Sequence, residues 1–355
     1  MICLMKNVIK IDGREISDEH PVYVIAEMSA NHLQDFGRAK RIIKCAKESG
    51  ADAIKLQTYK PDTITLDCHT EEFLATPGSP WEGMNLYELY ETAYTPWEWH
   101  EELFEYAKKI GITCFSSPFD ISAVDFLEEL KAPAYKIASF EIQDIPLIRK
   151  VASTGKPVII STGIADISDI KLALDTCIEM GNENIILLKC VSEYPTPYAE
   201  LNLRTIPNMR ETFKCITGLS DHSMGSCVPV AAVALGASVI EKHLTLSRND
   251  GGPDGSFSME PHEFGQMVDD IGNIKSALGF VSYDLSDKQK KSRERGRSLY
   301  VARDINKGDK FSYSNIKSVR PGYGLHPKYL DYIIGKRARK DLKFGEALLW
   351  EYVEI

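Results

Sequence analysis

Short apolar runs and longer amphipathic stretches alternate over residues 23–278 of this chain. Eight runs have the length and β-branched content of buried strands, and they lie at 23–27, 53–57, 113–117, 134–139, 158–162, 185–191, 215–220 and 239–244. Stretches with the 3.6-residue period of a helix follow them, at 36–49, 96–110, 120–131, 144–154, 166–180, 200–213, 226–236 and 261–278. A strand followed by a helix, repeated many times, predicts βα units and a parallel sheet.

Glycine marks the end of many of these helical stretches. Gly50, Gly111, Gly155, Gly181 and Gly236 stand where a helix should stop in a left-handed residue before the chain enters a strand. Eight βα units over about 275 residues have the ordinary size of a (β/α)8 barrel. We therefore predict an α/β protein whose residues 1–284 form a TIM barrel, although an open doubly wound sheet would show the same periodicity.

The repeating pattern stops near residue 285. The segment DLSDKQKKSRERGRS carries many charges and has no apolar face, which is typical of a linker, here at 285–296. Residues 297–355 then alternate short strand-like runs with turns and contain two similar phrases, DINKG at 304–308 and DLKFG at 341–345. They predict a small β-rich domain; the alternative is a tail that decorates the barrel.

Composition and charge exclude several classes of function. The chain has 42 Lys and Arg against 51 Asp and Glu, a net charge of -9, which argues against binding to nucleic acids or anionic membranes. Its eight cysteines form no C-x-x-C pair, so we expect reduced thiols of a cytoplasmic protein rather than a zinc ribbon or a disulfide scaffold. The N-terminal MICLMKNVIKIDGREI lacks the pattern of an export signal, and no apolar run approaches the roughly 18 to 20 residues of a membrane span.

Polar side chains stand at or just after the ends of the predicted strands, where TIM barrels carry their catalytic groups. A structural hydrogen bond would explain any one of them, but burying many around one axis is costly unless they pair or bind a shared ligand. The set is Glu27, Lys55, Gln57, Ser116, Ser117, Lys136, Ser139, Glu141, Ser161, Thr162, Ser192, Tyr194, Ser220, Asp221, His222, Glu241, Lys242 and His243.

Two histidines in this set predict a metal site. His222 and His243 follow consecutive strands, so a closed barrel brings them to neighbouring positions. Two imidazoles suit manganese, iron, cobalt or zinc, with the remaining positions left to water or substrate. Asp221 and Asp254 are candidates to support the ligands or to contact the substrate. The competing interpretation is a pair of hydrogen-bonded core histidines.

Two lysines and several serines in the same set predict an anion site. Lys55 and Lys136, together with Ser117, Ser139, Ser161 and Ser220, supply the cations and hydroxyl donors that hold a phosphate and a carboxylate. Phosphoenolpyruvate carries both groups. A Schiff base on Lys136 is the alternative, and it requires a neutral amine, whereas the surrounding hydroxyls and carboxylates favour a charged one.

Motifs over almost the whole chain resemble the sialic acid synthase family, whose members join phosphoenolpyruvate to an acylamino sugar and release phosphate. The matching phrases are IAE at 25–27 with Asn31 and His32, AIKLQ at 53–57, SSPF at 116–119, YKIAS at 135–139 with Glu141, STG at 161–163, YPTP at 194–197, GLSDH at 218–222, IEKH at 240–243, GPD at 252–254 and VRPG at 319–322. The resemblance implies a C-terminal antifreeze-like (SAF) domain that caps the active site of the other subunit in a domain-swapped homodimer.

The resemblance also implies roles for individual residues. Phosphoenolpyruvate is expected on Lys55, Ser117, Lys136, Ser139, Ser161, Ser192 and Ser220, and the sugar on Gln57, Tyr194, Asp254 and Arg320. The catalytic residues are Glu27, Glu141 and Lys136, and the metal ligands are His222 and His243. The expected metal is manganese, with magnesium or cobalt as alternatives. It would polarise the sugar aldehyde for attack by C3 of phosphoenolpyruvate. The base for the water that adds at C2 is either Glu141 or a metal-bound water.

Several phrases are most similar to the branch of this family that makes pseudaminic acid from 2,4-diacetamido-2,4,6-trideoxy-L-altropyranose. They are AEMSANH at 26–32, FSSPF at 115–119, ASFE at 138–141, RSLY at 297–300 and GLHPK at 324–328. Synthesis of N-acetylneuraminate or legionaminate by the same chemistry is the alternative, and Ser192 stands where the neuraminate branch tends to carry Asn. Alternatives of another kind are a Schiff-base aldolase and a carbohydrate- or ice-binding protein without catalytic activity.

Overall fold

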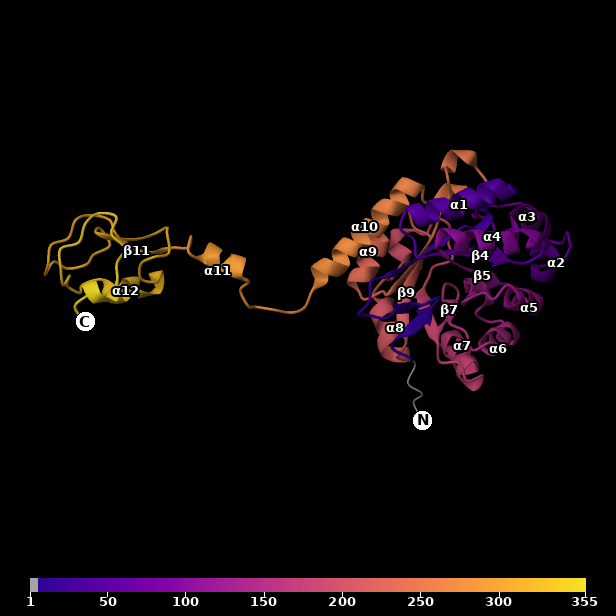
Figure 1. Ribbon diagram of the computed structural model, residues 1–355, viewed down its shortest axis with the longest axis horizontal. Coiled ribbons are helices and arrows are strands. Elements are labelled where there is room, and N and C mark those ends of the chain that lie inside the picture. Colours follow the sequence, from indigo (N-terminus) through magenta and orange to yellow (C-terminus); the bar gives the residue numbers. More distant parts are fainter. Residues whose placement is uncertain (1–5) are drawn as a thin grey trace. The chain divides into compact units, whose positions relative to one another are not determined.

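The computed structural model describes residues 6–355, which form two compact units (Figure 1). The first unit ends at Gly279 and the second begins at Phe280, and each is described by itself. Cys3 and the first residues of the segment expected to lack an export signal lie outside the described residues.

Eight parallel strands of the first unit form a closed barrel. They are β3 (Tyr23–Glu27), β4 (Ala53–Thr58), β5 (Thr113–Pro118), β6 (Tyr135–Ile137), β7 (Val158–Ser161), β8 (Ile185–Lys189), β9 (Ile216–Asp221) and β10 (Val239–His243). Each strand pairs with the next, and β10 pairs with β3 from Val239 opposite Tyr23 to His243 opposite Glu27. The predicted TIM barrel is confirmed, and the doubly wound alternative is wrong.

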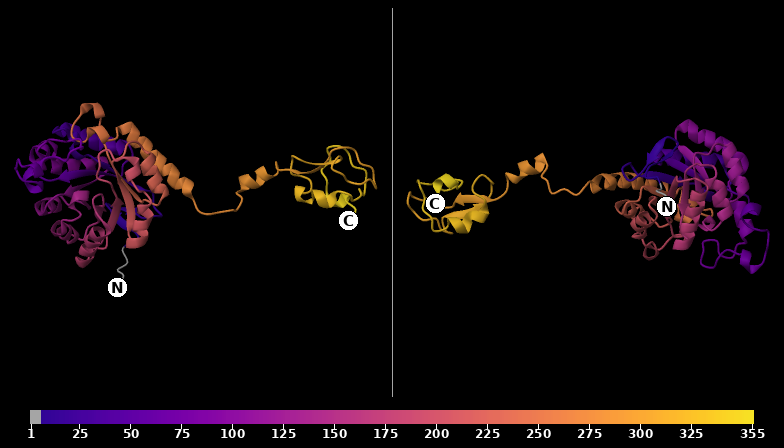
Figure 2. Two further views of the ribbon diagram at one scale, coloured as in Figure 1. Left: turned by 180° about the vertical axis from the view of Figure 1, so that it is seen from behind. Right: turned by 90° about the horizontal axis from the view of Figure 1, so that it is seen from below.

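Helices follow the strands and cover the outside of the barrel (Figures 1 and 2). They are α1 (Phe36–Glu48), α4 (Trp97–Ile110), α5 (Ile121–Glu129), α6 (Ile145–Ala152), α7 (Ile167–Glu179), α8 (Thr205–Phe213), α9 (Cys227–Ala234) and α10 (Pro261–Leu278). The five predicted cap glycines all have positive φ, between 70° and 97°. Helix α8 begins five residues later than predicted, because Asn202 adopts φ 47° and separates it from a short 3-10 helix at Tyr198–Glu200.

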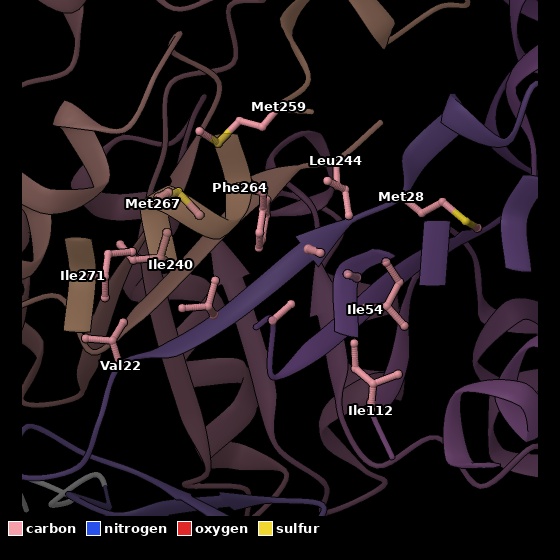
Figure 3. Close-up of a cluster of buried hydrophobic side chains, with 14 of the residues drawn as sticks. Val22, Met28, Ile54, Ile112, Ile240, Leu244, Met259, Phe264, Met267 and Ile271 are labelled. Atoms are coloured by element: carbon pink, nitrogen blue, oxygen red, sulfur yellow. The ribbon is translucent and has the colours of Figure 1, made fainter. Parts of the chain in front are cut away.

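The main hydrophobic core lies between the strands and this layer of helices. Figure 3 shows Phe264, Met267 and Ile271 of α10 beside Ile240 of β10. Alternate strand residues point into the barrel instead, where Tyr23, Ile25 and Phe115 belong to a separate buried cluster. Strands buried on both faces explain why these segments read as continuous apolar runs rather than as alternating ones.

A hairpin that the sequence pattern does not reveal closes the amino end of the barrel. It consists of β1 (Ile9–Ile11) and β2 (Arg14–Ile16), joined by Asp12 and Gly13, both at positive φ. Asp-Gly with this conformation is the preferred turn of a tight hairpin. The hairpin isoleucines are 0–1% exposed and pack with the first residues of the barrel strands, including Tyr23, Ala53 and Val239.

The connection from β4 to α4 is much longer than the others and was also not predicted. It spans residues 59–96 and contains α2 (Pro61–Ile64), a 3-10 helix at Glu71–Phe73 and α3 (Leu86–Ala93). Asn85 caps α3 by accepting hydrogen bonds from the backbone of Tyr87 and Glu88. Because β4 ends at Thr58, this excursion starts at the carboxyl end of the barrel, where the candidate site lies.

The second unit has its own small core. Helix α11 (Asp287–Arg293) precedes strands β11 (Ser298–Val301) and β12 (Ile316–Val319), which are antiparallel, and α12 (Leu330–Ile333) follows. The two similar phrases noted in the sequence pair with each other: Ile305 and Leu342 exchange both backbone hydrogen bonds. The unit divides from the barrel five residues earlier than the predicted 284, and the predicted linker contains α11, in which no residue is buried.

Within residues 6–355, no helix has the length and apolar character needed to cross a membrane. The seven cysteines in that part of the chain, Cys45, Cys68, Cys114, Cys177, Cys190, Cys215 and Cys227, are all free, as the scattered spacing predicts.

Candidate active site at the carboxyl end of the barrel

Two buried lysines and two buried glutamates meet inside the carboxyl end of the barrel. Lys55 Nζ lies 2.5 Å from Glu27 Oε2 and 3.6 Å from Glu241 Oε1, and Lys136 Nζ lies 3.7 Å from the same oxygen of Glu241. All four side chains are at most 6% exposed. Glu241 thus bridges the two lysines, a role that could not be distinguished in the sequence from that of any other strand-end polar residue.

This environment shifts the pKa values of the two lysines in opposite directions. Burial lowers the pKa of Lys55, but the carboxylates of Glu241 and Glu27 outweigh it, so its pKa is raised and it carries a charge. Burial also lowers the pKa of Lys136, and there it outweighs Glu241. The second direction differs from the expectation that the neighbouring carboxylates would dominate, because Lys136 has no carboxylate as close as Glu27 is to Lys55.

Serine hydroxyls line the strand ends next to the lysines. Lys55 Nζ donates to Ser117 Oγ at 3.2 Å, and Ser192 Oγ donates to Ser139 Oγ at 2.8 Å. Ser161 Oγ is buried and has no hydrogen-bond partner among the described residues, whereas Ser220 Oγ donates to Glu241 Oε1 at 3.3 Å. A buried, unpaired hydroxyl costs about 1–3 kcal/mol, so the hydroxyl of Ser161 at the end of β7 is suited to donate to a ligand that binds at this end of the barrel.

Gly163 leaves space among these serines that no other residue would leave. A Cβ atom at this position would overlap Ser192 Oγ and Ser139 Oγ and would come within 3.1 Å of Cys190 Sγ. The close approach of the backbone to these hydroxyls therefore requires glycine. It also brings the turn after β7 directly against the serines.

Glu141 stands next to this group in a 3-10 helix at Ser139–Glu141 that follows β6. Its Oε2 is buried and has no hydrogen-bond partner among the described residues. Burial raises the pKa of Glu141 to about 7, with Lys136 opposing the shift. Burial likewise raises the pKa of Glu27 to about 7 against the effect of Lys55. A carboxylate with a pKa near neutrality is suited to exchange protons with a substrate or water.

The two histidines lie side by side, as the barrel topology predicts. The ring centroids of His222 and His243 are 5.3 Å apart. His222 Nδ1 is 2.9 Å from the carbonyl oxygen of Val191, so Nδ1 carries a proton and Nε2 is left to face a ligand. Burial lowers the pKa of His222, but the neighbouring Cys190 outweighs it, so that pKa is raised. His243 Nδ1 is buried without a hydrogen-bond partner among residues 6–355, and burial lowers the pKa of His243 well below its usual value.

This donor set fits a catalytic metal rather than a structural one. Within residues 6–355, no group of three or more His, Cys, Asp or Glu is placed to enclose a metal ion. If His222 and His243 held a metal ion, two imidazoles would leave further positions to water or substrate, the arrangement of a metal that acts on a ligand. A metal binds the deprotonated nitrogen, so its binding would compete with a proton at His222.

A buried ion pair fixes the backbone on both sides of His222. Lys242 Nζ lies 2.5 Å from Asp221 Oδ2 and donates to the carbonyl oxygen of Ser223 at 2.5 Å. Asp221 Oδ1 in turn accepts the backbone N–H of Ser223 at 2.9 Å. Asp221, one of the two aspartates singled out in the sequence, thus acts on the turn that carries His222, and the role of Lys242 was missed because its partners are not apparent from sequence.

Aromatic rings and Asp254 surround the histidines on the other side. The Tyr194 ring is 4.3 Å from His222 and 5.0 Å from Phe257, centroid to centroid. Asp254 is 7% exposed and accepts hydrogen bonds from the Ser29 hydroxyl and, at 3.2 Å, from the backbone N–H of Ala30. Gln57 lies near the end of β4, opposite Ser117 of β5. The predicted sugar-binding residues of the barrel therefore lie at the end that carries the lysines and serines.

Arg320 is the one predicted site residue outside the barrel. It follows β12 in the second unit, where it is exposed and joined to Pro321 by a cis peptide bond. Its expected contact with the sugar of a partner subunit stays a prediction.

Comparison with known proteins gives a consistent assignment. The NeuB family model matches residues 42–283, and the SAF domain model matches residues 296–354. A pseudaminic acid synthase of Campylobacter jejuni is 48% identical over 327 residues, which are 92% of this chain and 95% of the relative. A pseudaminic acid synthase of Helicobacter pylori is 45% identical over 335 residues, 94% and 98% of the two chains.

Solved structures agree with the fold and the domain order. The spore coat polysaccharide biosynthesis protein SpsE of Bacillus subtilis superposes with a TM-score of 0.67 at 31% identity, covering 98% of this chain and 99% of that one. An N-acetylneuraminic acid synthetase of Leptospira borgpetersenii, solved with citrate, gives a TM-score of 0.71 at 32% identity over 82% and 96% of the chains. With its strand-end lysines, serines and histidines, its closed barrel and its C-terminal SAF domain, the chain belongs to the NeuB family.

Proposed function

We propose that this chain is a pseudaminic acid synthase, which condenses phosphoenolpyruvate with 2,4-diacetamido-2,4,6-trideoxy-L-altropyranose and water to give pseudaminic acid and phosphate. The observation that supports this most directly is the buried pair Lys55 and Lys136, bridged by Glu241 at the barrel end that also carries two adjacent imidazoles. The similarity of 45–48% to proteins named pseudaminic acid synthase supports the choice of sugar over that of the legionaminic acid synthases, which are 36% identical.

In this proposal the anionic substrate binds at the lysines. Lys55 and Lys136 neutralise the phosphate and the carboxylate of phosphoenolpyruvate. The hydroxyls that donate to them are those of Ser117, Ser139, Ser161, Ser192 and Ser220. The contact of Ser192 Oγ with Ser139 and its closeness to Gly163 support this role for Ser192.

The sugar binds towards the histidines. Gln57, Tyr194 and Asp254 contact its polar groups, and His222 and His243 hold a divalent metal, with manganese expected. When bound there, the metal would supply Lewis-acid polarisation of the aldehyde. Tyr194 orients the open-chain sugar, since its ring already lies against His222.

In this proposal the carboxylates of Glu27 and Glu141 act at C2 of phosphoenolpyruvate. As C3 of phosphoenolpyruvate bonds to the aldehyde carbon, positive charge develops at C2, and Glu27 and Glu141 stabilise it. Glu141 then takes a proton from the water that adds at C2, for which its pKa of about 7 is suited. Lys136 and Lys55 offset the charge of the phosphate group as it leaves.

The second unit completes the site in the proposal. The SAF domain places Arg320 of the partner subunit against the acylamino group of the sugar in a domain-swapped homodimer, so a monomer would lack part of the site. We further propose a cytoplasmic location, where phosphoenolpyruvate and reduced thiols are found together.

A substrate panel tests the proposed function. Phosphate release should be measured with phosphoenolpyruvate and each of three sugars: the altrose derivative, the corresponding legionaminic acid precursor and N-acetylmannosamine. We expect kcat/KM for the altrose derivative to exceed that for N-acetylmannosamine by about 100-fold or more, because several substituents differ. Equal or greater activity with N-acetylmannosamine would overturn the assignment. Covalent trapping by borohydride with substrate would instead show a Schiff base on Lys136.

The pH profile tests the role of Glu141. A carboxyl group with a pKa of about 7 is mostly protonated at pH 6 and mostly ionised at pH 8, so a base of this kind becomes active as the pH rises. We expect kcat/KM to rise roughly tenfold per unit below pH 7 and to level off above it. Glu141→Gln should lower kcat by about 10²- to 10⁴-fold and abolish the dependence on that group, whereas Glu211→Gln on the exposed side of α8 should change neither. An unchanged profile in Glu141→Gln would exclude Glu141 as the base.

A further inference from the structure

The long excursion between β4 and α4 brings a tryptophan to the site. Trp81 is half-buried, and its indole N–H donates to the carbonyl oxygen of Pro253 at 3.0 Å. Pro253 directly precedes Asp254, whose carboxylate contacts Ser29 and Ala30. Two segments that are 172 positions apart in the sequence are therefore joined beside a predicted sugar-binding residue.

Trp81 extends a row of aromatic rings that begins at the histidines. Its ring centroid lies 5.6 Å from that of Tyr194, with the rings inclined by 56°. Tyr194 in turn contacts His222 and Phe257, and Phe257 lies 5.2 Å from His243. Inclined rings at these separations attract one another, so these contacts hold Trp81 and Tyr194 in a defined arrangement beside the histidines.

We propose that Trp81 determines sugar specificity by packing against the apolar substituents of the substrate, the C6 methyl group and the methyl of the acetamido group at C4. This inference rests on the proposed function, because these substituents distinguish the altrose derivative from N-acetylmannosamine, which carries hydroxyl groups at C6 and C4. A methyl group against an indole loses only its contact with water. A hydroxyl in the same place loses hydrogen bonds that the aromatic row does not replace.

The test compares Trp81→Ala with two further variants. Trp81→Ala should raise KM for the altrose derivative about tenfold or more, leave KM for phosphoenolpyruvate within about twofold, and reduce the preference over N-acetylmannosamine by about tenfold. Trp81→Phe keeps an aromatic ring and loses only the hydrogen bond to Pro253, so its KM for the sugar should stay within about threefold of the wild type.

Trp97 provides a matched control on the same chain. Its indole N–H also donates to a backbone carbonyl, that of Tyr59, at 3.0 Å, and its ring stacks on Phe126 at 4.6 Å, but it belongs to helix α4 and lies outside the row formed by Trp81, Tyr194 and Phe257. Trp97→Phe should leave both KM values and the sugar preference unchanged. Circular dichroism checks that each variant is folded.

The outcomes separate the inference from the proposed function. If the wild type does not use the altrose derivative, the proposed function fails. If the wild type uses it and Trp81→Ala keeps the same KM and the same sugar preference, the function stands and the role of Trp81 is overturned. Equal increases in KM for the sugar and for phosphoenolpyruvate, or equal effects of Trp81→Phe and Trp81→Ala, would show a general structural role and would also overturn it.

Discussion

Removal of divalent metal should abolish phosphate release from phosphoenolpyruvate and the sugar, and added manganese should restore it. His222 and His243 present two adjacent imidazoles beside Tyr194, and Lewis-acid assistance to a carbonyl contributes several kcal/mol to a transition state. We expect a loss of about 10³-fold or more in kcat after chelation. Phosphate release and metal content per chain should be measured on the same samples.

Variants at the two ligands should show the same loss. His222→Ala and His243→Ala should bind less manganese and lose activity to a similar degree, because either change leaves a single imidazole. His262→Ala, at an exposed position of α10, removes a histidine without affecting the site and should keep both metal and activity. Full activity in samples from which all metal has been removed would contradict the proposed role.

Replacing Lys242 with methionine should cost about 3–5 kcal/mol of the free energy of unfolding of the barrel. The substitution leaves the carboxylate of Asp221, which is fully buried, without its cation and leaves the Ser223 carbonyl without a donor. Urea unfolding followed by circular dichroism measures the effect. The control is the same substitution in an exposed ion pair: Lys171→Met, which removes the partner of Asp175, should lower the free energy of unfolding by only about 0–1 kcal/mol.

A double variant makes the Lys242 test independent of whether the single variant folds. Replacing both partners, Lys242→Met with Asp221→Leu, removes the unpaired charge and should recover most of the lost stability, since an apolar pair can substitute for a buried ion pair. A cost below about 1 kcal/mol for Lys242→Met would show that the pair does not stabilise the turn around His222. No recovery in the double variant would show that the loss does not come from the unpaired carboxylate of Asp221.

The barrel was predictable because its information is local. Runs such as 185–191 have the length and β-branched content of a buried strand, and Gly111 or Gly181 marks each helix end by a conformation that few other residues adopt. The hairpin at Ile9–Ile16 was missed because each of its strands has only three residues, too few for a period to be recognised. Helix α11 was missed because no apolar face marks it; its start is fixed by hydrogen bonds between Ser286 and Gln289.

The site was predictable only to the level of strand ends. Closure of the barrel places β10 beside β3, which is how Glu241 comes to lie between lysines from β4 and β6. No property of Glu241 in the sequence distinguishes it from other strand-end carboxylates. The sequence gives even less sign of Trp81. A long excursion of mostly irregular structure brings it to Tyr194, and the contacts that position it there, with the Tyr194 ring and the Pro253 carbonyl, join segments far apart in the chain.

The hairpin at the amino end has a kinetic consequence. Ile9, Ile11 and Ile16 cover that end, and buried residues such as Phe115 and Leu188 fill the barrel behind them, so reactants and products reach the strand ends from the other side. Lys55 and Lys136 lie within strands, whereas Trp81 and Asp254 lie on connections beyond them. A molecule held by the lysines therefore lies deeper in the barrel than one that contacts Trp81 or Asp254. This arrangement favours ordered binding, in which the reactant that lies deeper binds first and the bulkier reactant binds after it.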